Sequence, residues 1–353
     1  MHLNMLSCHL SLLSTLLLTF TFPVRVCGLN TVISKDLICQ IITSNQYTCE
    51  RHLVRTADGY ELTLHRIPPK NTTHSQLQPP FILMHGLIGS ASDFLLPGRK
   101  RSLGCILHEQ GYDVWVPNSR GTTYSKRHLH MDSSNASFWD YSWHEIGYYD
   151  LPAIVDYILE TTGHQRLHYV AHSQGCTVFF VMLSEKPEYN EKIVSATLLA
   201  PVAFLANLRS PPFRIMAAKI EEIEKLFPRI LETTPAGISR KQFKHFGQLI
   251  SSGNFQKFDY QSKEENFRQY NRHTPPEYNL RNVRVPLQLF FGTRDLLLVK
   301  EDVVRLLQKL KNTKYVLHEL RGFNHIDMLY SNMAPRLIYK RIVNDVKDFN
   351  LKN

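Results

Sequence analysis

The sequence has little of what marks non-globular or disulfide-built chains. Of its 353 residues only six are Cys, 16 are Gly and 18 are Pro. Glycine and proline stand close to background usage, which excludes a collagen-like or low-complexity chain. Six cysteines are too few for a miniprotein held by disulfides. No Cys/His spacing typical of a metal site occurs, so we expect no metal. We expect no other cofactor either.

Long hydrophobic runs are also scarce. The stretch at 10–24 is shorter than the roughly 20 residues of a membrane span, and small residues follow at Val26-Cys27-Gly28. This pattern predicts a signal peptide over residues 1–28; a short membrane anchor and a buried N-terminal helix are the alternatives. No later stretch reaches about 18 apolar residues. We therefore expect no transmembrane segment and a secretory-pathway product, either secreted or delivered to the lysosome lumen. Two sequons, at Asn71 and Asn135, agree with this route and predict glycosylation there.

The formal net charge is +10, from 41 Lys and Arg against 31 Asp and Glu. A basic surface can favour nucleic acid or anionic lipid. The positive clusters, Arg99-Lys100-Arg101 and Lys126-Arg127, are however short and scattered. We interpret them as solvated faces and, since no nucleic-acid motif accompanies them, expect no nucleic acid partner.

Cleavage near residue 28 leaves four cysteines, which allow three disulfide connectivities. Cys39 and Cys49 lie close together in a polar segment, and we predict that they pair. Cys105 and Cys176 fall in apolar helical settings and are predicted to be buried thiols.

Short apolar runs alternate along the chain with stretches of helical periodicity, such as 151–159 and 177–183. Apolar strands that alternate with helices are typical of crossover units, which build a mostly parallel sheet covered on both faces. We therefore predict an α/β fold. The expected strands lie at 60–67, 81–84, 113–116, 168–171, 196–199, 287–291 and 314–320.

This rhythm stops between about 205 and 284, a polar region without strand-like runs. We predict a mainly helical cap at 205–284, inserted between two parts of the core at 29–204 and 285–353. Within it one apolar stripe at helical spacing, which Pro228 ends, packs on the core or contacts lipid. The stripe consists of Phe213, Met216, Ile220, Ile223 and Phe227.

The stretch Ala171-His172-Ser173-Gln174-Gly175 sits where an apolar strand turns into a helix. A serine becomes a nucleophile when a base takes its proton and a sharp turn holds its hydroxyl clear of the backbone. Such a turn needs small residues two positions either side of the serine, and Ala171 and Gly175 meet that need. Ser173 is the candidate nucleophile, with a simple turn as the alternative.

An acid and a base should follow in that order, each just past a strand. Asp295 follows the strand at 287–291, and His325 follows the strand at 314–320. Alone, each is more simply interpreted as a turn aspartate or a hydrogen-bonded loop histidine, but jointly with Ser173 the catalytic interpretation is favoured. Acyl transfer also needs N–H donors for an oxyanion. The backbone amides of Gln174 and Leu87 are the candidates.

With these motifs the chain resembles the acid lipase family of the α/β-hydrolases, the group of gastric lipase and lysosomal acid lipase. The resemblance covers about residues 39–345. It rests on Thr56-Ala57-Asp58-Gly59-Tyr60, His85-Gly86-Leu87, Asn118-Ser119-Arg120-Gly121, Phe138-Trp139-Asp140-Tyr141-Ser142-Trp143, Tyr149-Asp150-Leu151-Pro152-Ala153, His172-Ser173-Gln174-Gly175, Pro235-Ala236-Gly237, Pro275-Pro276-Glu277-Tyr278-Asn279-Leu280, the Asp295 loop and His325-Ile326-Asp327.

The resemblance implies an α/β-hydrolase fold with Ser173 as nucleophile, Asp295 as acid, His325 as base, and Leu87 and Gln174 as oxyanion donors. Ala171 replaces the first glycine of the family's turn, Cys176 replaces a threonine, and the cap is contracted between about 217 and 234.

The resulting hypothesis is a carboxylic ester hydrolase that acts on neutral lipid at a lipid–water interface. Triacylglycerol is the expected substrate, with cholesteryl ester as another. An esterase for small soluble esters and a catalytically silent lipid-binding protein are the rival hypotheses.

Overall fold

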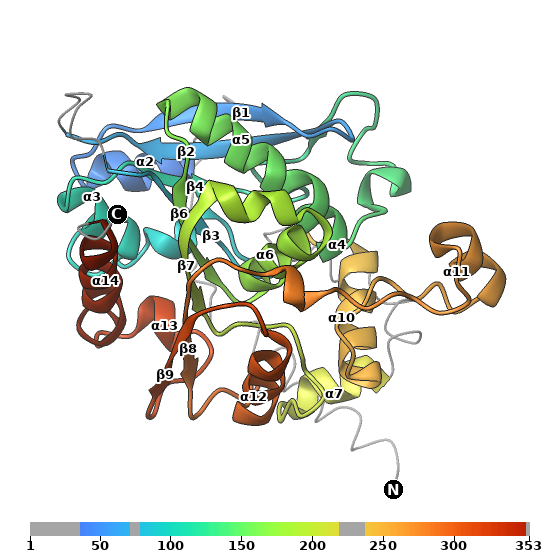
Figure 1. Cartoon of the computed structure of the whole chain (residues 1–353). Helices are drawn as coiled ribbons and strands as arrows, with labels where there is room; N and C mark the ends of the chain where they lie inside the picture. The colour runs from blue at the N-terminus through green and yellow to red at the C-terminus, as the bar shows by residue number, and fades with distance from the viewer. Residues whose placement is uncertain (1–35, 71–77, 219–236, 351–353) are drawn as a thin grey trace, which may run out of the picture.

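The computed structural model describes residues 36–70, 78–218 and 237–350 (Figure 1). The predicted signal peptide, the sequon at Asn71 and the part of the apolar stripe from Ile220 to Phe227 lie outside the described residues.

The described residues form one nine-stranded sheet in the order β1-β2-β4-β3-β6-β7-β8-β9, with the short β5 paired to β2. The strands are β1 (Glu50–Arg55), β2 (Tyr60–Ile67), β3 (Phe81–Met84), β4 (Val114–Pro117), β5 (Arg127–His128), β6 (Leu167–His172), β7 (Ile193–Leu199), β8 (Leu287–Gly292) and β9 (Tyr315–Leu320).

The strands β4, β3, β6, β7, β8 and β9 run parallel to one another, whereas β2 pairs antiparallel with β1, β4 and β5. Each apolar run that predicted a strand lies in this sheet, and the α/β fold class is confirmed. β1 was not predicted, because Glu50–Arg55 contains only two apolar residues, Leu53 and Val54, and forms a largely exposed edge strand. The two-residue β5 is too short to form an apolar run and was not predicted either.

Helices connect the strands. The α-helices are α2 (Leu37–Ser44), α3 (Leu103–Glu109), α4 (Trp143–Glu145), α5 (Leu151–Thr162), α6 (Gln174–Glu185), α7 (Pro211–Ala218), α10 (Arg240–Ser252), α11 (Lys263–Tyr270), α12 (Lys300–Lys309), α13 (Asp327–Tyr330) and α14 (Lys340–Asn350). Shorter 3₁₀ or π segments are η2 (Ala91–Phe94), η3 (Ala136–Trp139), η4 (Ile146–Asp150), η5 (Pro187–Lys192), η6 (Leu280–Asn282) and η7 (Pro335–Tyr339).

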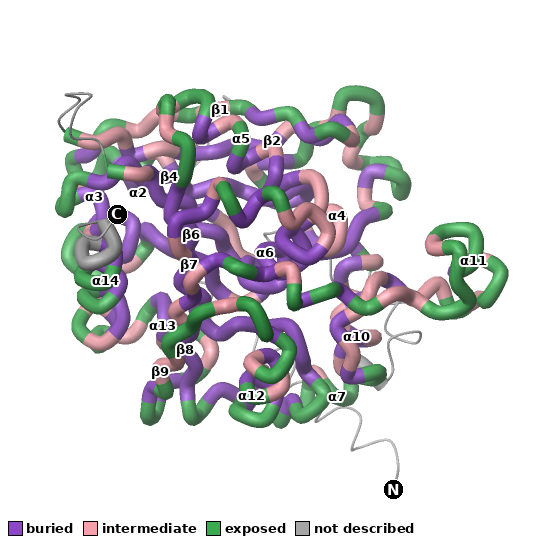
Figure 2. Tube along the Cα trace, viewed as in Figure 1, coloured by how far each residue is buried: buried purple, intermediate pink, exposed green. Residues whose placement is uncertain are grey.

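The sheet separates two apolar cores. On one face α5 and α6 pack against the strands; on the other, α2, α3 and α14 do so (Figure 1). The central strands are buried on both faces, as Figure 2 shows, which explains why their sequences are uninterrupted apolar runs. None of the described helices is long and apolar enough to cross a membrane.

The segment between β7 and β8 carries α7, α10, α11 and the short η6, joined by loops. Its described residues form no strand of the sheet and only one isolated bridge, Gln256 with Glu277. Ser239 begins α10 by accepting a hydrogen bond from the amide of Gln242, and Gly253 ends it in the left-handed conformation. α11 projects from the body and is largely exposed (Figure 2).

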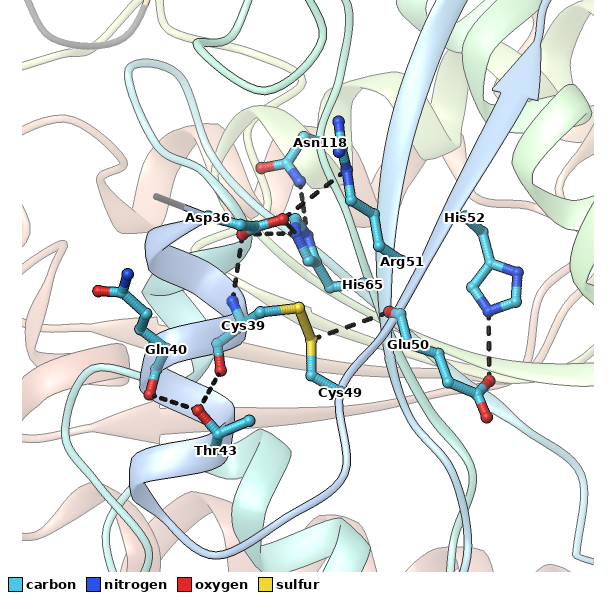
Figure 3. The surroundings of a disulfide bond; sticks show 10 residues. All are labelled: Asp36, Cys39, Gln40, Thr43, Cys49, Glu50, Arg51, His52, His65 and Asn118. Atoms are coloured by element: carbon cyan, nitrogen blue, oxygen red, sulfur yellow. Dashed lines mark hydrogen bonds and ion pairs between the residues drawn. A yellow bond between two sulfur atoms is a disulfide. The ribbon is translucent and has the colours of Figure 1, made fainter. Parts of the chain in front are cut away.

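Near the start of the described chain, Cys39 of α2 and Cys49 form a disulfide with a Cα–Cα distance of 5.4 Å (Figure 3). The bond ties α2 to the beginning of β1, the edge strand. Cys105 and Cys176 are free and buried.

Removing this disulfide should destabilise the fold without touching the sheet's centre. In a chain-entropy account, a loop closed over a sequence separation of 10 stabilises by about 2–3 kcal/mol. We expect the double variant Cys39→Ser/Cys49→Ser to lose about that much free energy of unfolding in a urea titration. Reductant should lower the stability of the wild type to that of the variant and leave the variant unchanged; equal stabilities without reductant would contradict the expectation.

Candidate active site

Ser173 occupies the junction between β6 and α6. Its backbone has φ +54° and ψ −116°, a conformation that a non-glycine residue rarely adopts. Its amide donates to the carbonyl of Leu199 at the end of β7 (2.9 Å). The strained turn therefore holds the serine at the carboxyl edge of the parallel strands.

Two glycines allow this turn to pack tightly. A Cβ on Gly175 would lie 2.6 Å from the carbonyl oxygen of Met84, at the end of β3. A Cβ on Gly86 would lie 3.2 Å from both the Cβ of Ser173 and the Nδ1 of His172. The loop after β3 thus lies directly against the serine; the position of Gly175 leaves no room for a side chain, and that of Gly86 leaves little.

The structure brings the three sequence-predicted residues of the triad together. His325 Nδ1 lies 2.7 Å from Asp295 Oδ2, and His325 Nε2 lies 2.8 Å from Ser173 Oγ. Since a carboxylate only accepts hydrogen bonds, Nδ1 carries the proton and Nε2 of the neutral ring accepts from the serine hydroxyl. Asp295 Oδ1 in turn accepts from the amides of Leu297 and Leu298 (2.8 and 2.9 Å).

His172, which was not among the residues predicted from the sequence, holds the loop of His325. Its Nε2 donates to the carbonyl oxygen of His325 at 2.8 Å, and the ring is buried. Burial, together with the neighbouring His325, lowers the pKa of His172 to about 3. His172 therefore stays neutral and joins the turn of Ser173 to the histidine loop. Its position beside the serine in the sequence does not predict this contact.

The two oxyanion donors predicted from the sequence lie in segments next to Ser173. Gln174 is the first residue of α6, where amides lack a partner within the helix, and Leu87 follows the glycine that touches Ser173. The side chain of Gln174 points elsewhere: its Oε1 accepts from Gln242 Nε2 of α10 at 2.6 Å. This contact couples the helical segment between β7 and β8 to the turn.

A buried polar layer supports the loop after β3. His85 Nε2 accepts from the amide of Ser119 at 3.1 Å, and burial lowers the pKa of His85 to about 4. The residue after Ser119, Arg120, is buried and pairs with Asp150 and Asp58. Such a buried charge is tolerated because both carboxylates also accept hydrogen bonds from it.

An apolar cleft opens above the serine. Its total empty volume, including the part open to solvent, is about 550 Å³. Its walls come from the loop after β7, from α7 and from α10, with Leu87, Leu297 and His325 near the floor. The remaining lining residues are Ser173, Val202, Leu205, Leu208, Phe213, Phe243, Phe246, Gly247 and Ile250.

In the part of the chain that the structure describes, Asp36, Cys39 and His65 are the one group with metal-ligand atoms in mutual reach. The sulfur of Cys39 is bonded to Cys49, and Asp36 accepts from His65 Nε2 at 2.9 Å (Figure 3). These contacts occupy the donor atoms, so we assign no metal to this group.

Chemically, the arrangement can activate a hydroxyl. The serine proton can pass to His325 while Asp295 stabilises the resulting imidazolium, and two backbone amides can hold a developing oxyanion.

Filling the space at Gly175 should impair the serine more than the fold. In Gly175→Ala the new Cβ would collide with the carbonyl oxygens of Met84 and His85 (2.6 and 2.9 Å), so the turn must shift. A displacement of about 1 Å at such a site costs on the order of 10²-fold in rate. We expect at least that loss in the rate at which a fluorophosphonate probe labels Ser173.

Gly163→Ala is the matched control. Gly163 ends α5 with φ +72°, and a Cβ added there would meet no atom within 4 Å, so alanine costs only the strain of its backbone, about 1 kcal/mol of stability. Its labelling rate should equal that of the wild type. Wild-type labelling of a folded Gly175→Ala protein would refute the steric argument.

Buried neutral histidines should make the fold sensitive to acid. Burial lowers the pKa of His85 to about 4 and of His172 and His245 to about 3, against about 6.5 in an unfolded chain. Between these values the unfolded chain binds protons that the native state does not, so stability falls as pH falls. Asp93 acts in the opposite direction, because burial raises its pKa to about 6. Near pH 5 the native state therefore holds about one proton on Asp93 that the unfolded chain does not, which reduces the difference in bound protons by about one.

We therefore expect the free energy of unfolding to fall by about 3 kcal/mol per pH unit near pH 5 from these four groups. Urea titrations between pH 7 and pH 4.5 measure this slope. His245→Asn should reduce this slope by the share of one proton, about 1.4 kcal/mol per pH unit, whereas His273→Asn, at an exposed position, should leave it unchanged. A slope that is the same in both variants would contradict the assignment.

The comparisons with known proteins agree with this geometry. Residues 79–275 match a family described as alpha/beta hydrolase fold, and residues 38–98 match a partial alpha/beta-hydrolase lipase region. Lipase 1 of Drosophila melanogaster is 38% identical, covering 86% of this chain and 78% of the relative. Gastric triacylglycerol lipase of Homo sapiens is 34% identical, covering 88% of this chain and 91% of the relative.

Solved structures share the fold at low identity. An esterase of Pyrococcus furiosus superposes with a TM-score of 0.54 at 18% identity, covering 92% of this chain and 97% of the other. A monoacylglycerol lipase of Paleococcus ferrophilus gives 0.51 at 17% identity, covering 82% and 99%. Because the family match spans more than half of the chain and lipases align over most of it, the chain belongs to the α/β-hydrolase fold family, in its gastric-lipase-like branch, and is a carboxylic ester hydrolase.

Proposed function

We propose that the chain hydrolyses the carboxylic esters of neutral lipids, triacylglycerol above all, with Ser173 as nucleophile, His325 as base and Asp295 as the orienting acid. One observation carries the proposal: the hydrogen bonds from Ser173 to His325 (2.8 Å) and from His325 to Asp295 (2.7 Å) end at the floor of an apolar cleft.

In the first half of the reaction, His325 Nε2 takes the proton of Ser173 Oγ as the oxygen attacks the ester carbonyl carbon. The tetrahedral intermediate carries its negative charge on the former carbonyl oxygen, where the amides of Leu87 and Gln174 stabilise it. His325 then protonates the departing alcohol, and an acyl-serine remains.

In the second half, water attacks the acyl-serine with His325 again as base, and the fatty acid leaves. Asp295 fixes the ring of His325 with the proton on Nδ1 and stabilises the imidazolium in both halves. Two backbone amides fix Asp295 in turn, so the carboxylate keeps its orientation while the ring changes charge.

The choice of a lipid substrate rests on the cleft and on the relatives. Its lining is almost entirely aliphatic and aromatic, which suits an acyl chain and offers few polar partners to a small soluble substrate. Relatives that align over most of the chain are named gastric triacylglycerol lipase and Lipase member K. Triacylglycerol is therefore the first substrate to test, with cholesteryl ester second.

We also propose that the chain acts in the secretory route, either outside the cell or in the lysosome lumen. The disulfide between Cys39 and Cys49 supports an oxidising compartment. Of the two proposed glycosylation sites, Asn135 lies in the described part of the chain and is exposed, as an acceptor must be.

The decisive experiment uses the purified chain and measures fatty-acid release from emulsified triolein and emulsified tributyrin. In parallel it measures p-nitrophenol release from soluble p-nitrophenyl acetate. We expect hydrolysis of both emulsions, and a loss of at least about 10⁴-fold in Ser173→Ala because the other triad members cannot replace a missing nucleophile. Ser44→Ala, an exposed serine at the end of α2, is the control and should retain full activity.

The rival hypotheses give different results. Activity on p-nitrophenyl acetate alone, without fatty-acid release from emulsions, would indicate an esterase for small soluble esters. No activity on any substrate and no labelling of Ser173 by a fluorophosphonate would indicate a silent lipid-binding protein.

A further inference from the structure

The loop that carries the proposed oxyanion donor is strained. Ile88, which follows Leu87, has φ +58°, and a β-branched residue in the left-handed region is a genuine outlier. The Ile88 side chain is 61% exposed, so core packing does not hold it in this conformation. The loop closes with a hydrogen bond from the amide of Gly89 to the carbonyl of Gly86 (3.2 Å). Some further contact must keep the turn in place.

That contact is the carboxylate of Asp93, on η2 immediately after the loop. A Cβ on Gly89 would lie 2.2 Å from Asp93 Oδ2, so the carboxylate presses directly on the backbone of the turn. Backbone groups at Ser90 and Gly86 also favour its charged form. The carboxylate thus lies against the Gly89 end of the turn that presents Leu87.

Asp93 also reaches the segment of the catalytic histidine. The hydroxyl of Tyr330, the last residue of α13, donates to Asp93 Oδ1 at 3.4 Å. Arg101 donates to the carbonyl of the same tyrosine at 3.2 Å. α13 begins two residues after His325, so Asp93 lies between the loop of the oxyanion donor and the element that follows the base.

Burial makes the charged form of Asp93 unfavourable. Burial raises its pKa to about 6, although its hydrogen bonds favour the ionised form.

We infer that Asp93 is a positioning residue for ester hydrolysis: its carboxylate holds the strained turn from Gly86 to Gly89 so that the Leu87 amide points at the oxyanion. The inference rests on the proposed function and adds a residue to it. Asp93 touches no reacting atom and acts through the loop.

The test uses the purified full chain, soluble p-nitrophenyl butyrate as substrate and butylboronic acid, which adds to the serine as a tetrahedral anion. In Asp93→Asn, which keeps the shape of the side chain but removes its charge beside the Gly89 backbone and the Tyr330 hydroxyl, we expect kcat to fall about 10- to 100-fold and KM to stay unchanged. The boronate should bind weaker by a similar factor, because its anion uses the same donors.

A double-mutant cycle with Gly89→Ala separates positioning from loss of fold. Gly89→Ala alone drives a methyl group into the carboxylate and should lower kcat, whereas in an Asp93→Ala background that clash is absent and the further loss should be small. Asp132→Asn, at an exposed loop position that bonds to Ser134, is the matched control and should leave kcat and boronate affinity unchanged.

The outcomes separate the two proposals. A wild type without esterase activity would overturn the proposed function itself. An active wild type with an Asp93→Asn variant that keeps its kcat, or loses kcat only in proportion to its folded fraction, would overturn the role of Asp93 and leave the proposed function standing.

Discussion

The conformation of Ser173 is the constraint on which the rest of the site depends. A serine at φ +54° costs on the order of 1–3 kcal/mol, so the surroundings must over-determine it. Two features hold Ser173 in this conformation: the hydrogen bond from its amide to the carbonyl of Leu199, and close packing at Gly175 and Gly86. Because the turn lies at the carboxyl edge of parallel strands, the loops after β3, β8 and β9 converge on the serine.

Buried polar contacts that surround the turn of Ser173 help to hold its strained backbone. His172 joins the turn to the histidine loop, and the pair of Arg120 with Asp150 supports the segment that holds His85. These groups are buried and either neutral or fully paired, which keeps the cost of burial low. Because the buried histidines stay neutral, the native state binds fewer protons than the unfolded chain, and acid therefore destabilises it.

The fold could be predicted from the sequence, and the three residues of the proposed triad could be found in it, because these signals are local. Apolar or alternating runs marked every strand except β1 and β5, and Ser173, Asp295 and His325 each follow such a run. The supporting contacts could not be predicted, because they depend on three-dimensional proximity: Gln242 reaches Gln174 from a distant helix. β1 was missed because an exposed edge strand lacks an apolar run.

The contact between His172 and the histidine loop shows why some of the geometry has no counterpart in the sequence. His172 bonds to the backbone of His325, not to its ring, so any residue could stand at 325 as far as this bond is concerned. A backbone acceptor is present at every position, and a sequence pattern built from residue types therefore cannot record it. The side chains of the proposed triad can be found in the sequence, while the contacts that hold them in place depend on main-chain groups and become visible only in the folded chain.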